Sequence, residues 1–192
     1  MLCANINSFF SQIGKKFADF VKKSQNEEEN NKREINMLST EVIYNRLIKN
    51  EGIRLKPYKC PAGYLTIGVG RNLDLNPLTE EEKETIKDVS RGITKDQAFM
   101  LLRHDVDKVC DQLDNRLPWW RNLDSERQYV LIDMCFNMGI NKLVGFKNTL
   151  SYLAQGNYDQ AATNLMLSKY AKQVKQRAKR NADCIRTGKY EN

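Results

Sequence analysis

The chain has 192 residues, of which 41% are hydrophobic and 29% charged, and a formal net charge of +7 at pH 7. This length suits one domain with a buried core, and the composition excludes collagen-like, fibrous and wholly disordered classes of protein. Eight Lys and Arg side chains against two carboxylates lie in residues 166–192. This concentrated charge suits a polyanion, but it does not distinguish nucleic acid, anionic lipid and an acidic wall polymer.

The five cysteines are odd in number and include no C-x-x-C pair, so at least one lacks an intramolecular partner. Cys110 and Cys135 lie among apolar residues, which is typical of core thiols. The single histidine, His104, is isolated from them. The sequence therefore predicts no metal and no cofactor, and we expect synthesis in a reducing compartment.

Residues 1–24 place large apolar side chains at helical spacing with lysines between them, which predicts an amphipathic helix. The segment lacks the roughly 18 uninterrupted apolar residues of a membrane span, and it lacks the pattern of a signal peptide. Such a helix either packs on its own domain or contacts a membrane surface or a partner. Residues 25–37 are almost entirely polar and predict a linker before a folded domain over 38–190.

The folded domain is expected to begin with a helix that Ser39 or Thr40 caps and that Gly52 ends. From 64 to 69, large apolar side chains alternate with other residues, as in a half-buried strand. The sequence CPAG just before this segment has proline second and glycine fourth, as a type I turn prefers. Residues 55–69 therefore predict a β-hairpin.

The remainder of the chain predicts helices. Three capping boxes indicate helix starts, at Thr79 with Glu82, at Thr94 with Gln97, and at Ser125 with Gln128. The segment YVLIDMCFNM, 129–138, is apolar nearly all round and is expected at the centre of the core, with Gly139 ending it. Further helices are expected near 143–155 and 158–170, the second capped by Asn157. These elements predict an α+β fold in which a small hairpin lobe leans on a larger helical lobe, with a ligand cleft between them.

Glu51 is expected in the last turn of its helix, beside the negative end of the helix dipole and partly covered by the hairpin. Both effects disfavour the ionised carboxylate, and a neutral carboxyl is what a general acid requires. Strand alternation places Thr66 opposite Leu65 and Ile67, toward solvent or the cleft. With Cys60 at the start of the turn, three side chains could converge on one ligand. Taken singly, they are also ordinary residues of a helix end, a turn and a strand.

The spacing of Glu51, Cys60 and Thr66, with eight and five residues between them, resembles that of phage-type lysozymes, glycoside hydrolase family 24. Further matches are ITKDQA at 93–98, FNMGINKLVGF at 136–146, YDQAATNL at 158–165 and RAKRNADCIRTGKY at 177–190. The resemblance covers residues 38–190. It implies a two-lobed, lysozyme-like muramidase that cuts the β-1,4 bond between N-acetylmuramic acid and N-acetylglucosamine in peptidoglycan, and so lyses bacteria.

On that pattern Glu51 is the general acid, and Thr66 supplies the hydroxyl that helps to place the attacking water or the substrate. Cys60 stands where the best-known members of the family carry aspartate. The usual glycosidase needs two carboxylates. A thiolate is an anion and a nucleophile and could replace the second one. The alternative is that the cysteine disables the site.

Three further residues match cleft-facing or substrate-facing positions of the family. Asn137 could hydrogen-bond an N-acetyl group, and Arg177 could meet a carboxylate of the substrate peptide. Phe136 fits the cleft as well as the core. Arg71 stands where many relatives have histidine, so we expect no histidine ion pair at that position.

Two non-enzymatic hypotheses remain open: a catalytically silent peptidoglycan-binding module, and a cationic protein that permeabilises membranes through residues 1–24 and the basic tail. No motif supports nucleic-acid binding. We expect a monomer whose main partner is peptidoglycan. The resemblance implies synthesis in the cytoplasm of a bacterial host and action on the wall, in the periplasm or outside, after release through a membrane pore, because no signal peptide is evident.

Overall fold

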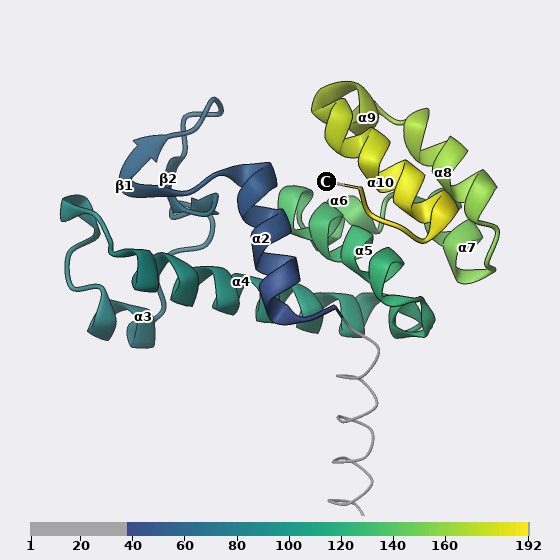
Figure 1. The fold of residues 1–192 in the computed structure, drawn as a ribbon. Coiled ribbons are helices and arrows are strands. Elements are labelled where there is room, and N and C mark those ends of the chain that lie inside the picture. Colours follow the sequence, from purple (N-terminus) through teal and green to yellow (C-terminus); the bar gives the residue numbers. More distant parts are fainter. Residues whose placement is uncertain (1–37, 192) are drawn as a thin grey trace, which may run out of the picture. The chain divides into compact units, whose positions relative to one another are not determined.

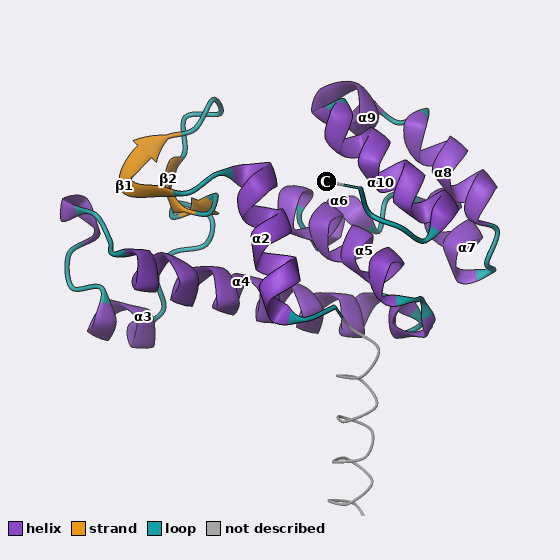
Figure 2. Ribbon diagram, in the orientation of Figure 1, coloured by secondary structure: helices purple, strands orange, loops and turns teal. Residues whose placement is uncertain are grey.

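A computed structural model of the protein describes residues 38–191, so the helix and linker expected over 1–37 lie outside the described residues. The helices are α2 (Thr40–Glu51), α3 (Glu80–Thr85), α4 (Lys95–Arg116), α5 (Ser125–Met138), α6 (Ile140–Leu143), α7 (Lys147–Ala154), α8 (Tyr158–Met166), α9 (Lys169–Val174) and α10 (Gln176–Thr187). Short 3-10 helices lie at η1 (Val89–Arg91) and η2 (Trp120–Asn122), and the strands are β1 (Arg54–Lys59), β2 (Leu65–Gly68) and β3 (Arg71–Asn72). The strands occupy one short stretch among helices (Figure 2). This confirms the mostly helical α+β class.

The strands form one antiparallel sheet in the order β1-β2-β3. Thr66, on the middle strand, lies opposite Tyr58 of β1 and Asn72 of β3. The predicted hairpin is therefore confirmed. The third strand was not predicted because its two residues are too few to show an alternating pattern.

The hairpin turn begins at Cys60. The amide of Gly63 donates to the carbonyl of Cys60 at 2.8 Å, and the amide of Cys60 donates to the carbonyl of Tyr64 at 2.9 Å. Gly63 has a φ of +86°, which side chains rarely tolerate and which glycine adopts freely. This is a type I turn closed by a left-handed glycine, and it holds Cys60 at the junction of strand and turn.

Helix α2 begins and ends where the sequence predicts. The Ser39 hydroxyl accepts a hydrogen bond from the amide of Val42 at 3.5 Å, and Gly52 follows the helix with a φ of +74°. Ile43 and Leu47 bury one face of the helix. As a result, Glu51 is the last helical residue, at the point where the chain turns toward β1.

Helix α4 belongs to both lobes. At its N-terminal end it joins a buried cluster with the sheet, made of Ile67, Ile86, Ile93, Ala98 and Leu101. Farther along, α4 contacts α5 and α6 of the helical lobe. Figure 1 shows α4 running from beside the strands to the helices that follow it. Helix α4 therefore contributes to the packing of both lobes.

Helix α5 lies at the centre of the helical lobe, as predicted. Every residue from Gln128 to Cys135 is buried, and α5 contacts α4, α6 and α10. One member of this run, Asp133, is charged and has an exposed fraction of 0%. A carboxylate buried this deeply requires partners.

The predicted start of α5 was one residue late. Asp124, not Ser125, caps the helix, because its side chain accepts a hydrogen bond from the amide of Arg127 at 3.0 Å. Gln128 is buried, and its amide group donates to the carbonyl of Leu123 at 2.8 Å. Its place in the core thus prevents the reciprocal contact of a capping box. The boxes at Thr79 and Thr94 are confirmed.

The two long helices expected over 143–155 and 158–170 were wrong in their bounds. The first is α7 and begins only at Lys147, after a turn at 144–146 that follows the short helix α6, and the second ends at Met166. Ser168 then caps α9, accepting from the amide of Ala171 at 3.1 Å. Asn157 makes no side-chain cap bond to α8. The apolar pattern continues through these breaks because successive short helices pack on the same core, so periodicity alone did not reveal them.

Arg71 anchors β3 to α3 and α4. It is 4% exposed, and its guanidinium lies 2.8 Å from Glu82 Oε2 and 2.6 Å from Asp105 Oδ1. His104 Nδ1 lies 2.9 Å from the other oxygen of Glu82. Position 71 therefore holds an arginine that is paired with two carboxylates. The histidine that contacts Glu82 comes from α4 instead.

This cluster predicts a pH-dependent stability. Burial raises the pKa of Asp105 to about 6, against a partial opposing effect of Arg71, whose charge is shared with Glu82. The folded state therefore binds this proton more tightly than the unfolded state does. The free energy of unfolding should fall as pH rises from about 4 to about 6, by on the order of 1–3 kcal/mol from this group.

In Asp105→Asn we expect that slope to be lost, as measured by urea unfolding at intervals between pH 4 and pH 7. Glu84→Gln, at an exposed position of α3, is the matched control and should keep the wild-type slope. An Asp105→Asn variant whose stability varies with pH as in wild type would show that another group is responsible.

Candidate active site

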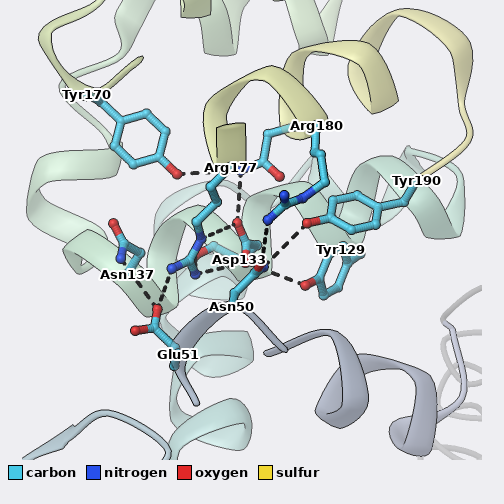
Figure 3. Close-up of polar contacts among 10 residues, drawn as sticks. Asn50, Glu51, Tyr129, Asp133, Asn137, Tyr170, Arg177, Arg180 and Tyr190 are labelled. Atoms are coloured by element: carbon cyan, nitrogen blue, oxygen red, sulfur yellow. Dashed lines mark hydrogen bonds and ion pairs between the residues drawn. The ribbon is translucent and has the colours of Figure 1, made fainter. Parts of the chain in front are cut away.

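Glu51 lies where α2, α5, α10 and the β2–β3 turn meet. Its side chain is 21% exposed. Oε1 accepts hydrogen bonds from Arg177 Nη1 and from Asn137 Nδ2, the second at 3.4 Å (Figure 3). Oε2 faces Gly70, where a Cβ atom would lie 3.4 Å from this oxygen. Glycine at this position therefore leaves room beside the carboxyl group.

The two donors at Oε1 distinguish the oxygens of Glu51. An oxygen that already accepts from a guanidinium and an amide is a poor place for a proton, because both neighbours are donors. Oε2 is the oxygen suited to carry a proton and to deliver it. The sequence indicated the helix end and the hairpin as neighbours of Glu51, but it did not indicate the ion pair with Arg177.

Arg177 is held by a second carboxylate. Its Nε lies 2.9 Å from Asp133 Oδ2, and its Nη2 lies 2.8 Å from Asp133 Oδ1. Burial lowers the pKa of Arg177, but the hydrogen bonds and charges of Asp133 and Glu51 outweigh burial and raise it. The guanidinium of Arg177 is therefore already paired with two carboxylates of this chain, those of Asp133 and Glu51. The expected contact of Arg177 with a substrate carboxylate has no support in this geometry.

Cys60 and Thr66 form the second part of the site. Partial burial raises the pKa of the Cys60 thiol, but hydrogen bonds with the backbone of Ala62, Tyr64 and Gly63 and an interaction with the Thr66 side chain outweigh it, and the pKa is lowered from its ordinary value. A lowered pKa increases the fraction of thiolate, the nucleophilic form.

Thr66 is 4% exposed, so of the two expected directions it does not face open solvent, and its direction toward the cleft remains a prediction. The unpredicted β3 pairs with the second edge of β2, which makes β2 the middle strand and places Asn72 next to Thr66. The Thr66 hydroxyl donates to the carbonyl of Tyr64 at 3.1 Å and contacts the Cys60 thiol. The position of Thr66 therefore suits a residue that orients the Cys60 thiol.

The other described cysteines differ from Cys60. Burial raises the pKa of Cys110 to about 11, and it raises the pKa values of Cys135 and Cys184 to about 12. These are core thiols, as the sequence predicts for Cys110 and Cys135. Among the described cysteines, therefore, only Cys60 has an environment that favours the thiolate.

The structure brings the predicted residues together in two groups. Glu51, Asn137 and Arg177 form the first, and Cys60 and Thr66 the second. Phe136 is half-buried beside Asn137 near the end of α5. The cleft between the lobes remains a prediction: a cavity of about 700 Å³ lies in the helical lobe instead, around Phe146 and Asn164.

Sequence reasoning missed the residues beneath Glu51. Asn50 Nδ2 donates to Asp133 Oδ1 at 2.9 Å, and Arg180 Nη2 donates to Asn50 Oδ1 at 2.7 Å. Arg180, half-buried, is therefore bound within the protein. One signal was present in the sequence: Asp133 is the single charge in YVLIDMCFNM, and a charge in an apolar helix indicates a functional or paired position.

Within residues 38–191 no group of three or more His, Cys, Asp or Glu side chains is placed to hold a metal ion. In the same part of the chain, no helix combines the length and the apolar character needed to cross a membrane.

Comparisons with known proteins agree with this geometry. The phage lysozyme family model matches residues 48–182. A probable T4-type lysozyme of Dictyostelium discoideum is 28% identical over 160 residues, which cover 76% of this chain and 94% of the relative. An endolysin of Acyrthosiphon pisum secondary endosymbiont phage 1 is 34% identical over 124 residues, covering 62% of this chain and 73% of the relative.

The pre-baseplate central spike protein of Enterobacteria phage T4 is 29% identical over 158 residues, which cover 76% of this chain but only 28% of that protein. The similarity thus extends to a module within a much longer chain. The family model covers well over half of the sequence, including Glu51, Cys60, Thr66 and Arg177. The chain therefore belongs to the phage lysozyme family and is a glycoside hydrolase.

Proposed function

We propose that the protein is an endolysin that hydrolyses the β-1,4 bond between N-acetylmuramic acid and N-acetylglucosamine in bacterial peptidoglycan. The observation that carries the proposal is the environment of Glu51, whose Oε1 is fixed by Arg177 and Asn137 while Oε2 faces the space beside Gly70. This arrangement suits a general acid, which must be oriented through one oxygen and must transfer a proton from the other.

In the proposed reaction Glu51 protonates the glycosidic oxygen as the bond to C1 of N-acetylmuramic acid breaks. The N-acetylglucosamine leaves with a free 4-hydroxyl, and positive charge develops at C1. The Cys60 thiolate stabilises this charge and takes a proton from the water that attacks C1. The products are a hemiacetal at C1 and a Cys60 thiol, which returns its proton to the solvent while Glu51 regains one.

Thr66 holds the Cys60 thiol in this scheme, because its side chain contacts the sulfur and its hydroxyl is fixed on the backbone of Tyr64. Asn137 is exposed at the end of α5 and reaches Glu51. We assign to it the recognition of an N-acetyl group of the substrate, with Phe136 beside it as the apolar neighbour.

The proposal includes a place of action. The protein is made in the cytoplasm of a bacterial host and reaches the wall after release through a membrane pore, and it acts as a monomer. Residues 1–24 contact the membrane surface during this passage, because an amphipathic, lysine-rich helix binds at the interface rather than spanning the membrane.

The test is digestion of purified peptidoglycan sacculi by the purified protein, with reducing ends assayed over time. A rise in reducing ends supports the proposal. Binding to sacculi without new reducing ends would favour the silent-module hypothesis. Deletion of residues 1–36 addresses the membrane hypothesis: lysis that disappears with the deletion, while digestion of sacculi continues, would assign lysis to the N-terminal segment.

The proposed role of Cys60 predicts selective alkylation. In a Cys3→Ser background, iodoacetamide near neutral pH should modify Cys60 and leave Cys110, Cys135 and Cys184 intact, because the pKa is lowered at the first and raised by burial at the others. Loss of wall digestion should parallel modification, with peptide mass spectrometry locating the adduct.

Cys60→Asp in the same background is the control. It restores a carboxylate at the position and should resist the reagent while it digests sacculi. If the enzyme remains fully active when Cys60 is completely alkylated, the thiolate has no part in the reaction.

A further inference from the structure

Asp133 is a buried carboxylate that accepts hydrogen bonds from side chains of three helices. Its Oδ1 accepts from Asn50 of α2 at 2.9 Å, from Arg177 of α10 at 2.8 Å, and from the hydroxyl of Tyr129 on its own helix at 3.4 Å. Its Oδ2 accepts from Arg177 and from Asn181 of α10, both at 2.9 Å. Figure 3 shows the side chains of Asn50, Tyr129 and Arg177 directed at Asp133 from different sides.

The core does not require a charge at this position. Asp133 is 0% exposed and stands in a run of buried residues that is otherwise suited to an apolar helix. A buried ion pair is on average no more stabilising than an apolar pair of the same volume, because both charges lose their hydration. Stability alone therefore does not account for Asp133.

Two routes connect Asp133 to Glu51. The first passes through Arg177, which contacts Asp133 with Nε and Nη2 and Glu51 Oε1 with Nη1. The second passes through Asn50, the residue directly before Glu51, whose side chain is held by Asp133 and Arg180. Asp133 therefore holds the side chain of Glu51 through Arg177 and the neighbouring backbone through Asn50.

The charge of Asp133 matters as well as its geometry. A guanidinium next to a carboxyl group favours the ionised form of that group, and an ionised Glu51 has no proton to donate. Asp133 places a negative charge on the other side of the same guanidinium and so offsets its field at Glu51. Arg177 therefore orients Oε1 while its positive charge is shared with a second carboxylate.

We propose that Asp133 is a positioning residue of the active site: it fixes Arg177 and Asn50 around Glu51 and offsets the guanidinium charge, so that Glu51 is held in place by an arginine whose charge is already paired. The proposal rests on the function proposed above, because it assigns Asp133 a role in that hydrolysis. Asp133 acts through these neighbours and does not touch the substrate.

The test is Asp133→Asn, which keeps the volume but removes the charge and turns one acceptor into a donor. We expect kcat for digestion of soluble wall fragments to fall about 10- to 100-fold, with KM little changed. The limb of the pH–rate profile that depends on Glu51 should move to lower pH, because the positive charge of Arg177 is then no longer offset. A wild-type kcat, or a limb that does not move, would overturn the proposal.

A control separates positioning from general destabilisation. Leu153→Ala removes a side chain that is 2% exposed in α7, away from this network, and should cost about 2–5 kcal/mol of stability. Assayed well below its melting temperature, it should keep both the wild-type kcat and the wild-type pH limb. A shifted limb in Leu153→Ala would mean that lost stability alone moves the profile, and would remove the support for Asp133.

Titration of Glu51 by carbon-13 NMR of its carboxyl carbon reports on the same charge without any activity. The midpoint should be lower in Asp133→Asn than in wild type, and this holds even if the wild-type protein proves unable to digest the wall. An unchanged midpoint contradicts the electrostatic part of the proposal. The two proposals can therefore fail separately.

If Asp133→Asn does not fold, Asn50→Ala tests the second route. It removes a neutral, half-buried side chain, and we expect kcat to fall severalfold with KM and the pH limb unchanged. Wild-type kinetics in Asn50→Ala would then overturn the positioning role.

Discussion

Glu51→Gln is expected to lose digestion of peptidoglycan by at least about 100-fold, because general acid catalysis contributes factors of about 10²–10⁴ and an amide cannot supply the proton. The fold should be kept. The amide oxygen of glutamine can still accept from Arg177 and Asn137, as Glu51 Oε1 does. Release of reducing ends from sacculi, together with circular dichroism and thermal unfolding, measures both properties.

Glu41→Gln is the matched control, because Glu41 lies exposed in the first turn of the same helix α2. It should digest sacculi as fast as wild type. A Glu51→Gln enzyme that is equally fast would show that the proton comes from another group, and the assignment of the site would fail.

Arg177→Met is expected to cause the largest loss of stability, about 3–5 kcal/mol, because it leaves Asp133 buried without its main partner. Arg177 is 8% exposed and Asp133 is 0% exposed, so water cannot replace the guanidinium. Urea unfolding measures the loss. Lys179→Met, at an exposed position of the same helix, should change the free energy of unfolding by less than about 0.5 kcal/mol.

The double variant Asp133→Leu with Arg177→Met tests the reason for that loss. Replacing both charges with apolar side chains should restore most of the stability that the single change removes, while digestion stays impaired because Glu51 has lost its partner. A double variant as unstable as Arg177→Met alone would show that packing, not an unpaired charge, causes the effect.

Local signals predicted much of the fold. Ser39 and Gly52 bound α2, and the boxes at Thr79 and Thr94 start α3 and α4, because capping depends on residues three or four positions apart. Tertiary packing decided the rest. Gln128 is drawn into the core and so cannot complete a box at Ser125, and the breaks around 145 and 167 follow from how short helices fit on α5 and α10.

The site was predictable in its members but not in their contacts. Glu51, Cys60 and Thr66 are close in sequence, so their spacing reveals them. Arg177 is 126 positions away from Glu51, and no local pattern indicates which carboxylate a distant arginine binds. Asp133 carried a signal, as a lone charge in an apolar helix, but its five donors come largely from α2 and α10 and become visible only in the folded chain.

The most direct test of the proposed reaction is mass spectrometry of sacculi digested by the wild-type protein and then reduced with borohydride. Hydrolysis of the proposed bond leaves N-acetylmuramic acid at each new reducing end, so muropeptides ending in the reduced form of that sugar should accumulate, and they should be absent with Glu51→Gln. Products that end in N-acetylglucosamine, or in a 1,6-anhydro sugar formed without water, would contradict the proposed cleavage.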